Sequence, residues 1–514
     1  MEKQPFSYPD RVVKPLGFTD NSVSVDKWNL VKIAVQIVLG QFTFSIYPFP
    51  VVIGSITVIA GLFFLSLYRG DYFFFLMQLF ICNHFMFGYE NGGVYNMAAT
   101  VVLLGYLGFY NNRFLPVSVM SKTTISIIVA LVIIQMISVL NNGNAFGIKI
   151  SAVLIFCNLM FLFFYSSKIK ISEDNFYSFL KITGVFFIYS FCIALNQKYS
   201  FFYSPFAFFP SLDPNAEYEY GILRSVGTLG NFEYYAEYSV SIIALLLPGI
   251  LSNSASEKKI TFLYFCCTIV FVGALSIFLS GTRSSILLLP LVVLMVCLFL
   301  GKRLKIRIII RASIAISVFM IINSGLHLID FDVFSKRSQG VDMKKLTIAK
   351  IISGEDMNRG PIFAYGINKA LNSSLFYGEG YFTNRAEYVR VHFDNMGTDV
   401  IPDYHNLYMS AIVIWGYLGA ILVLGLFLET IIRGFRLYFR LRHLNHFMVD
   451  LLLGFNILFS IFLINQFKIE FIRDANYFLL ILILLSFYNS LIYLLKENSV
   501  IIKRIPDTTF TSPQ

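Results

Sequence analysis

Apolar stretches long enough to cross a bilayer follow one another along almost the whole chain. A transmembrane helix needs about 20 apolar residues, and on that scale we count about fourteen spans. They lie near residues 30–47, 49–68, 72–88, 94–110, 123–140, 148–166, 179–197, 235–252, 260–279, 284–300, 305–324, 405–432, 447–466 and 475–495. The first two are short and closely spaced, so pairing as a hairpin would reduce the count. Only 14% of the residues are charged, whereas a soluble domain has about a quarter. The sequence therefore predicts an all-α polytopic membrane protein with about 12 to 14 transmembrane helices.

One long polar segment, 325–404, interrupts this pattern. Residues 341–353 have the spacing of a short helix lying on the membrane interface. A second helix is expected at 360–371, because a proline stands near its start and proline favours the first helical position. Gly378 and Gly380 then permit a turn or the close approach of a ligand. Since the rest of the chain offers few polar groups, we expect the chemistry at this partly helical loop.

Lys and Arg are distributed unevenly around the spans. Cytoplasmic loops are enriched in these residues, and placing the N-terminus inside puts about half of the 40 on that side. The densest runs, 302–307 and 433–442, then lie inside, while the short turns 47–48, 89–93 and 141–147 lie outside and contain none. The net charge of +10 is explained by this topology, and no nucleic-acid partner is expected.

The topology predicts five regions. They are a cytoplasmic N-terminal segment (1–29), eleven spans (30–324), a large periplasmic loop (325–404), three spans (405–495) and a cytoplasmic tail (496–514). The first region is polar and lacks the features of a cleavable signal peptide. Both termini are thus expected in the cytoplasm.

No metal or other cofactor is expected. The six cysteines, at positions 82, 157, 192, 266, 267 and 297, all fall in apolar spans without a CxxC pair. The histidines are scattered without metal-ligand spacing. The first outer turn, near 47–49, has no acidic pair of the kind that metal-dependent membrane glycosyltransferases carry there.

Four short motifs follow one another between about residues 220 and 430. They are Gly227–Asn231, Leu279–Ser285, Arg359–Phe363 with Leu375–Gly380, and His405–Tyr408 with Trp415–Gly419. In this order, around a long loop, they resemble the bacterial O-antigen ligase/polymerase superfamily. The resemblance implies a GT-C-like membrane glycosyltransferase. The arginine–glycine spacings reported for some polymerases are absent, so spacing does not separate polymerase from ligase.

The resemblance implies a reaction on undecaprenyl-diphosphate-linked oligosaccharide at the periplasmic face of the bacterial inner membrane. We favour a polymerase of O-antigen or another surface polysaccharide, because the long, divergent first half suggests a strain-specific glycan. The alternative enzyme is a ligase that transfers the glycan to lipid A-core or protein. The alternative of another class is a flippase of the same lipid-linked glycan. Expected partners are the lipid-linked donor and acceptor, membrane lipids and a chain-length regulator.

Three arginines are candidates to bind the diphosphate leaving group. An arginine side chain binds phosphate oxygens bidentately and does not deprotonate. Arg283 lies in a short turn between two spans, where an uncompensated charge is costly, so it is the first candidate. Arg224 and Arg359 lie beside motifs on the same predicted side. The structural alternative for Arg283 is a side chain that extends to the interface for hydration.

His405 is the candidate general base, because its ordinary pKa lies near working pH. Asp403 or Tyr404 is placed to orient the imidazole ring, and Asn406 follows His405 at the helix start. The structural alternative is a histidine whose hydrogen bonds are made by the backbone at that start. Glu233, or Glu237 one turn later, is the alternative base or an arginine partner. With Asn231 and the two loop glycines, these residues complete the predicted substrate site.

Overall fold

The computed structural model describes residues 31–37, 49–84, 92–110, 119–141, 146–199, 218–219, 222–252, 260–306, 360–381 and 406–504. The predicted interfacial helix 341–353, most of the predicted span 305–324 and both termini lie outside these residues. The named elements are α2 (Phe49–Tyr68), α3 (Tyr72–Cys82), α4 (Gly92–Tyr110), α5 (Lys122–Asn141), α6 (Phe146–Ser166), α7 (Glu173–Tyr199), β1 (Tyr218–Glu219), β2 (Ile222–Leu223), α9 (Phe232–Leu251), α10 (Ile260–Ser280), α11 (Arg283–Leu300), η2 (Gly301–Arg303), α15 (Gly360–Leu371), α16 (Leu407–Leu441), α17 (Phe447–Asn465), η6 (Phe471–Arg473) and α18 (Ala475–Arg504).

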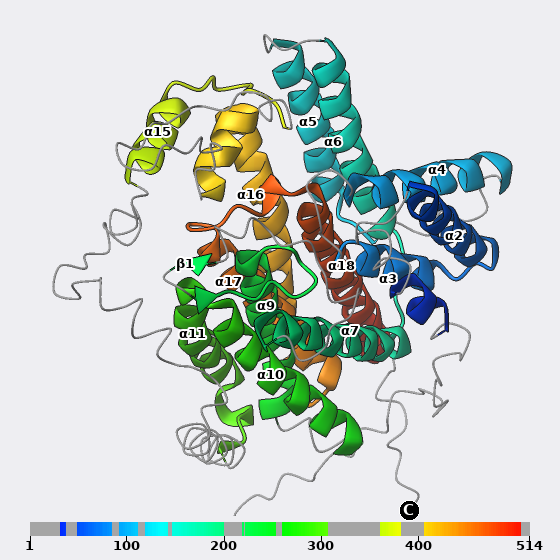
Figure 1. The fold of residues 1–514 in the computed structure, drawn as a ribbon. Helices are drawn as coiled ribbons and strands as arrows, with labels where there is room; N and C mark the ends of the chain where they lie inside the picture. Colours follow the sequence, from blue (N-terminus) through cyan, green and yellow to red (C-terminus); the bar gives the residue numbers. More distant parts are fainter. Residues whose placement is uncertain are drawn as a thin grey trace, which may run out of the picture.

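Helices make up nearly all of this structure (Figure 1). Nine of those in the described ranges are long and apolar enough to cross a membrane, and three shorter apolar helices lie at 53–68, 72–82 and 95–109. The two antiparallel strands, β1 and β2, have two residues each. The predicted class, an all-α polytopic membrane protein, is confirmed.

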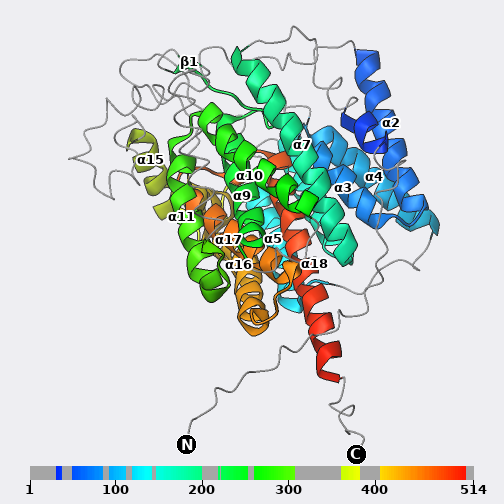
Figure 2. The ribbon, with the colours of Figure 1, turned by 90° about the horizontal axis from the view of Figure 1, so that it is seen from below.

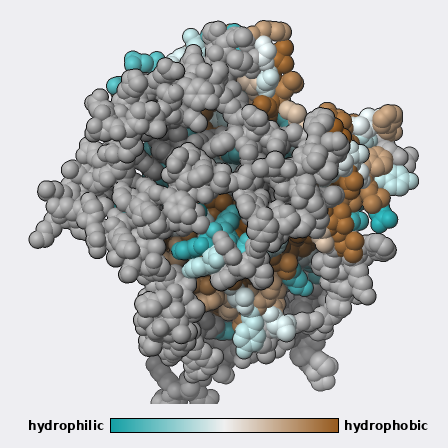
Figure 3. Space-filling view, viewed as in Figure 1, coloured by the Kyte–Doolittle hydropathy of each residue, from teal (hydrophilic) through white to brown (hydrophobic). Residues whose placement is uncertain are grey.

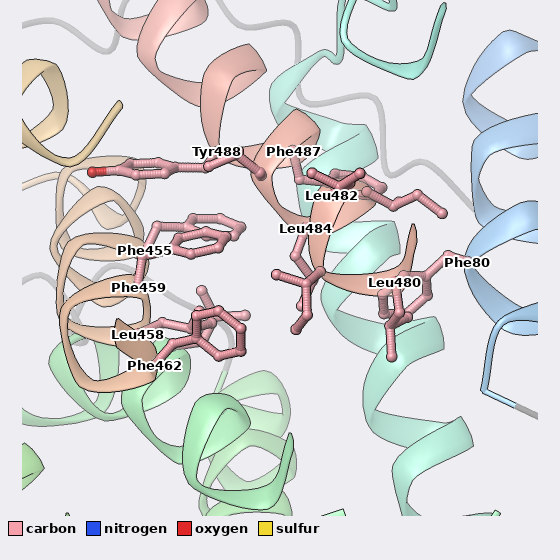
Figure 4. Packing of buried hydrophobic residues seen from close by; sticks show 14 of the residues in the cluster. Phe80, Phe455, Leu458, Phe459, Phe462, Leu480, Leu482, Leu484, Phe487 and Tyr488 are labelled. Carbon is pink, nitrogen blue, oxygen red and sulfur yellow. The ribbon is translucent and has the colours of Figure 1, made fainter. Parts of the chain in front are cut away.

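Three helices form the centre of the bundle. Of their most apolar windows, 94% of α9, 89% of α17 and 94% of α18 are buried inside the protein, compared with 28% of α11. Aromatic rings fill the contact between α17 and α18, where the rings of Phe455 and Phe459 stack on that of Tyr488 with centroids 5.4 and 5.5 Å apart (Figure 4). Because lipid tails are as apolar as these side chains, this close packing, and not the hydrophobic effect, holds the helices together.

The helices alternate in direction, and their ends gather into two polar layers. Figure 2 shows β1 at one end of the bundle and the C-terminal end of α18 at the other. The first layer, called here the β-end, contains the starts of α9, α11, α16 and α18. The second, the basic end, is held by the buried Asp450, which pairs with Arg303 at 2.6 Å and accepts a hydrogen bond from Ser252.

Helix α16 is broken. At 35 residues it would be about 52 Å long if straight, longer than the hydrocarbon core of about 30 Å. Gly416 has φ 73° and ψ 177°, which ends one helical segment at 415 and starts another at 417. Residues 417–441 are long enough to cross the membrane alone. Residues 407–415 therefore form a separate, shorter segment, called here the outer half of α16.

Candidate functional site

Arg224 lies at the β-end, directly after β2, and is buried. Its Nε donates to the Ser280 carbonyl at 2.9 Å and its Nη2 to Thr282 Oγ1 at 3.2 Å. The guanidinium carbon lies 3.2 Å from the ring centroid of Phe232, so the planar group stacks on the first residue of α9. The structure therefore holds Arg224 against the α10–α11 turn, which continues into Arg283.

The segment that carries Arg224 is clamped to α7. Gln197 accepts hydrogen bonds from the backbone of Val226 and Gly227, each at 3.1 Å, and returns one to the Gly227 carbonyl at 3.2 Å. Gly227 has φ +58°, and a Cβ there would lie 2.6 Å from Ser190 Oγ. Only glycine fits this tight turn without strain. The first motif thus fixes the path of the chain between Arg224 and α9.

The two predicted asparagines begin helices. Asn231 Oδ1 accepts from Glu233 N at 2.7 Å, and Asn406 Oδ1 accepts from Tyr408 N at 3.0 Å. Both are N-caps, which satisfy backbone donors that a helix start leaves unpaired. Asn406 also donates to the Phe467 carbonyl at 3.3 Å and so ties α16 to the end of α17. Glu233, half-buried, follows in the first turn of α9.

Glu237 is the centre of a buried polar network at the same end. Its Oε1 accepts from Asn465 Nδ2 at 2.6 Å and Gln466 Nε2 at 2.7 Å, and its Oε2 accepts from Tyr477 Oη at 2.8 Å. The carbonyl of Gln466 accepts from Leu407 N at 3.0 Å, which links the network to the start of α16. The carboxylate thereby joins α9, α17 and α18, and through Gln466 reaches the residue after Asn406.

A second buried carboxylate, Glu470, lies beside this network. Ser410 in the outer half of α16 donates to Glu470 Oε2. Tyr234 donates to the Glu470 carbonyl at 3.4 Å and stacks on Tyr477 with ring centroids 4.2 Å apart. Glu470 was not among the site residues predicted from the sequence, although the largely polar stretch 465–470 between two apolar spans is a visible signal of this layer.

Three predicted catalytic or binding residues, Arg359, Asp403 and His405, lie outside the described residues. Of the loop glycines, Gly380 donates its N–H to the Ile414 carbonyl at 2.8 Å, and Gly378 donates to Ser138 Oγ at 3.1 Å. In this structure α16 makes the close approach that these glycines permit.

The β-end presents polar groups within an apolar bundle. Seen from that end, hydrophilic residues show near the middle of the molecule, with hydrophobic surface beside them (Figure 3). In the described ranges, no group of three His, Cys, Asp or Glu side chains is placed to hold a metal ion. What the arrangement offers is a fixed cation at Arg224 and, at the same end of the bundle, buried carboxylates that hold helix ends together.

Replacing Glu237 with alanine is expected to destabilise the protein, because three donors in a buried site lose their acceptor. At about 0.6 to 1.7 kcal/mol for each interhelical hydrogen bond in a membrane, the loss is about 2–5 kcal/mol. Heating in detergent and following exposure of the buried thiols Cys82 and Cys266 measures it. Glu497→Ala, which removes an exposed pair with Lys170, is the control and should melt like the wild type. Equal melting of Glu237→Ala and the control would show that the network contributes no stability.

Residues 268–424 match the family described as O-antigen ligase. The match contains α10 from residue 268 onward, α11, α15 and the outer half of α16, and so includes the second, third and fourth motifs. No curated protein matches the chain. The match confirms the resemblance to the O-antigen ligase/polymerase superfamily.

Proposed function

We propose that this chain, which carries an O-antigen ligase domain at residues 268–424, polymerises undecaprenyl-diphosphate-linked oligosaccharide repeats into a surface polysaccharide. The observation that carries the proposal is the position of Arg224. Its side chain is buried, and it is held on the turn that begins α11 inside the matched domain. A fixed, planar cation at a membrane end suits a lipid diphosphate.

In the proposed reaction, an acceptor hydroxyl attacks the anomeric carbon of the donor sugar. The bond from that carbon to the diphosphate oxygen breaks, and undecaprenyl diphosphate leaves with the electron pair. Arg224 and Arg283, with Arg359, stabilise its negative charge, while His405 takes the proton of the hydroxyl. Asp403 orients the imidazole ring. A single displacement inverts the anomeric centre, and NMR of donor and product tests this.

The proposed site faces the periplasm from the bacterial inner membrane. The β-end is assigned to the outside because the Lys- and Arg-rich turns, including 301–306 and 433–446, lie at the opposite end. On this assignment 325–404 is a periplasmic loop, and both termini are cytoplasmic. The proposed reaction uses no metal or other cofactor.

A ligase is the second candidate, because the description of the matched family favours it. A ligase shares the donor and the leaving group, and it differs only in the acceptor, which is lipid A-core or a protein side chain. Both enzymes need the same arginines. The acceptor is therefore the property to test.

Deleting the gene and separating the surface polysaccharide on a gel distinguishes the candidates. A polymerase defect leaves a single repeat attached to the core, and this is the expected result. A ligase defect leaves none attached, with lipid-linked polymer accumulating. Repeats trapped on the cytoplasmic side of the membrane would indicate a flippase, and a normal ladder would contradict all three.

A further inference from the structure

The break in α16 leaves backbone groups that an unbroken helix would pair. In a regular helix the N–H of residues 417 and 418 would bond to the carbonyls of 413 and 414. In this chain a segment of the loop supplies the missing partners: it donates to the carbonyls of 413 and 414, and it accepts from the N–H groups of 417 and 418. The four hydrogen bonds are Glu379 N to Val413 O (2.8 Å), Gly380 N to Ile414 O (2.8 Å), Tyr417 N to Ser374 O (3.4 Å) and Leu418 N to Leu375 O (3.0 Å). Residues 374–380 thus replace the missing turn.

Glycines make this contact sterically possible on both sides. A Cβ on Gly416 would lie 2.7 Å from Ser374 O, and φ +73° already disfavours any other residue. A Cβ on Gly378 would lie 2.6 Å from Ile414 O. Since the obstructing atoms are backbone, a side chain at either position would push the loop and the helix apart.

Helix α5 holds the same contact from a third direction. Gln135 Oε1 accepts from Trp415 Nε1 at 2.8 Å and from Tyr381 N at 2.9 Å, and its Nε2 donates to Tyr381 O at 3.2 Å. The rings of Tyr381 and Trp415 stack with centroids 5.7 Å apart. The Gln135 side chain therefore connects Tyr381, which follows the loop segment 374–380, to Trp415, the last residue before the break.

On the loop side, the contact extends to α15. Lys369 pairs with Glu379 at 2.6 Å, and Ala370 packs against Met409 and Val413 of the outer half. Helix α15, the loop segment and the outer half of α16 therefore form one packed unit. The third and fourth motifs interlock in this unit.

We propose that residues 374–381, the break at Gly416 and Gln135 form a loop–helix staple that sets the position of the outer half of α16, and with it His405. The proposal rests on the proposed function, because the position matters for catalysis only if His405 acts on the acceptor. Gly416, Gly378 and Gln135 are then positioning residues. Two of the three arginines proposed to bind the donor diphosphate, Arg224 and Arg283, lie at the α10–α11 turn and outside the staple, so donor binding should be largely kept when the staple opens.

Tryptophan fluorescence tests the staple without an activity assay. The chain has two tryptophans, Trp28 and Trp415, so Trp28→Phe leaves the buried Trp415 as the single emitter. In the full-length chain in detergent, Gly416→Ala and Gln135→Met should each red-shift the emission and raise acrylamide quenching by about twofold or more, as local opening exposes the indole. Gly425→Ala is the control in the same helix, because its Cβ would meet only Ile127 Cδ1, at 3.8 Å. Gln135→Met keeps the backbone intact, so it decides the question if the glycine variant does not fold. Emission and quenching unchanged from the control would overturn the staple.

The positioning role is tested with lipid-linked oligosaccharide extracted from a strain that lacks this chain. Misplacing a catalytic group by about 1 Å costs up to about 100-fold, so kcat of Gly416→Ala and Gln135→Met should fall by about 10- to 100-fold. The KM for the donor should stay within about twofold. The rates are expressed per folded protein, because a smaller folded fraction alone would also lower the apparent kcat at unchanged KM. If a variant opens the staple, as judged by fluorescence, and its kcat still equals that of Gly425→Ala, the positioning role is overturned. A wild-type chain that transfers nothing from this extract would refute the proposed function, and with it the positioning role, while the fluorescence still decides whether the staple exists.

Discussion

Chain growth is expected to fall by about 100-fold or more when Arg224 is replaced with lysine. The guanidinium donates in two directions, to Ser280 O and Thr282 Oγ1, while its flat face stacks on Phe232. A lysine ammonium keeps the charge and cannot reproduce that fixed, planar arrangement, so the cation is no longer held where the diphosphate departs. Polysaccharide ladders from cells producing equal amounts of membrane-inserted protein measure the effect. Arg283→Ala should give a loss of the same order.

The control for Arg224→Lys is Arg436→Lys, an exposed arginine on the half of α16 that runs to the basic end. Its ladder should match the wild type. If Arg224 and Arg283 bind the same diphosphate, the double variant should lose less than the product of the two single effects. A wild-type ladder from Arg224→Lys would remove this residue from the proposed site.

The membrane helices could be predicted from the sequence because, in a membrane, each apolar run must make its backbone hydrogen bonds within its own segment. Polar ends were harder to predict. The span expected at 179–197 begins at Glu173, since the first turn of α7 contains charged residues that a hydropathy window rejects. The break at Gly416 gave no local signal, because glycine is common in transmembrane helices. Its cause is the loop segment 374–380, whose backbone replaces a helical turn.

The site was predictable in part for a related reason. Arg224 was a candidate because it lies beside a motif on the same predicted side as Arg283, and the structure places it on the α10–α11 turn that continues into Arg283. Asn231 and Asn406 were assigned to substrate from their motifs, whereas the structure shows each as a helix cap, a local role that asparagine commonly has. The network of Glu237 depends on partners 228 to 240 positions away in sequence. Only the packing of α9 against α17 and α18 identifies them.

His405→Ala is expected to lower kcat by about 10²- to 10⁴-fold, the usual contribution of a general base. His405 itself lies outside the described residues, whereas the residues that follow it are placed by hydrogen bonds. It precedes Asn406, which caps α16 and donates to Phe467 O, and Leu407, which bonds to Gln466 O. The chain just after the histidine is thus fixed at the β-end, the end that also holds Arg224.

The pH profile separates a base from a structural histidine. A histidine ordinarily titrates near pH 6.5, and only its neutral form accepts a proton. The wild-type kcat should therefore fall about tenfold for each pH unit below that value, and the residual rate of His405→Ala should lack this slope. His443→Ala, an exposed histidine at the basic end, should keep both the rate and the slope. A His405→Ala variant that retains the acid limb would assign the proton transfer to another group, and Glu233, in the first turn of α9, would then be the next residue to replace.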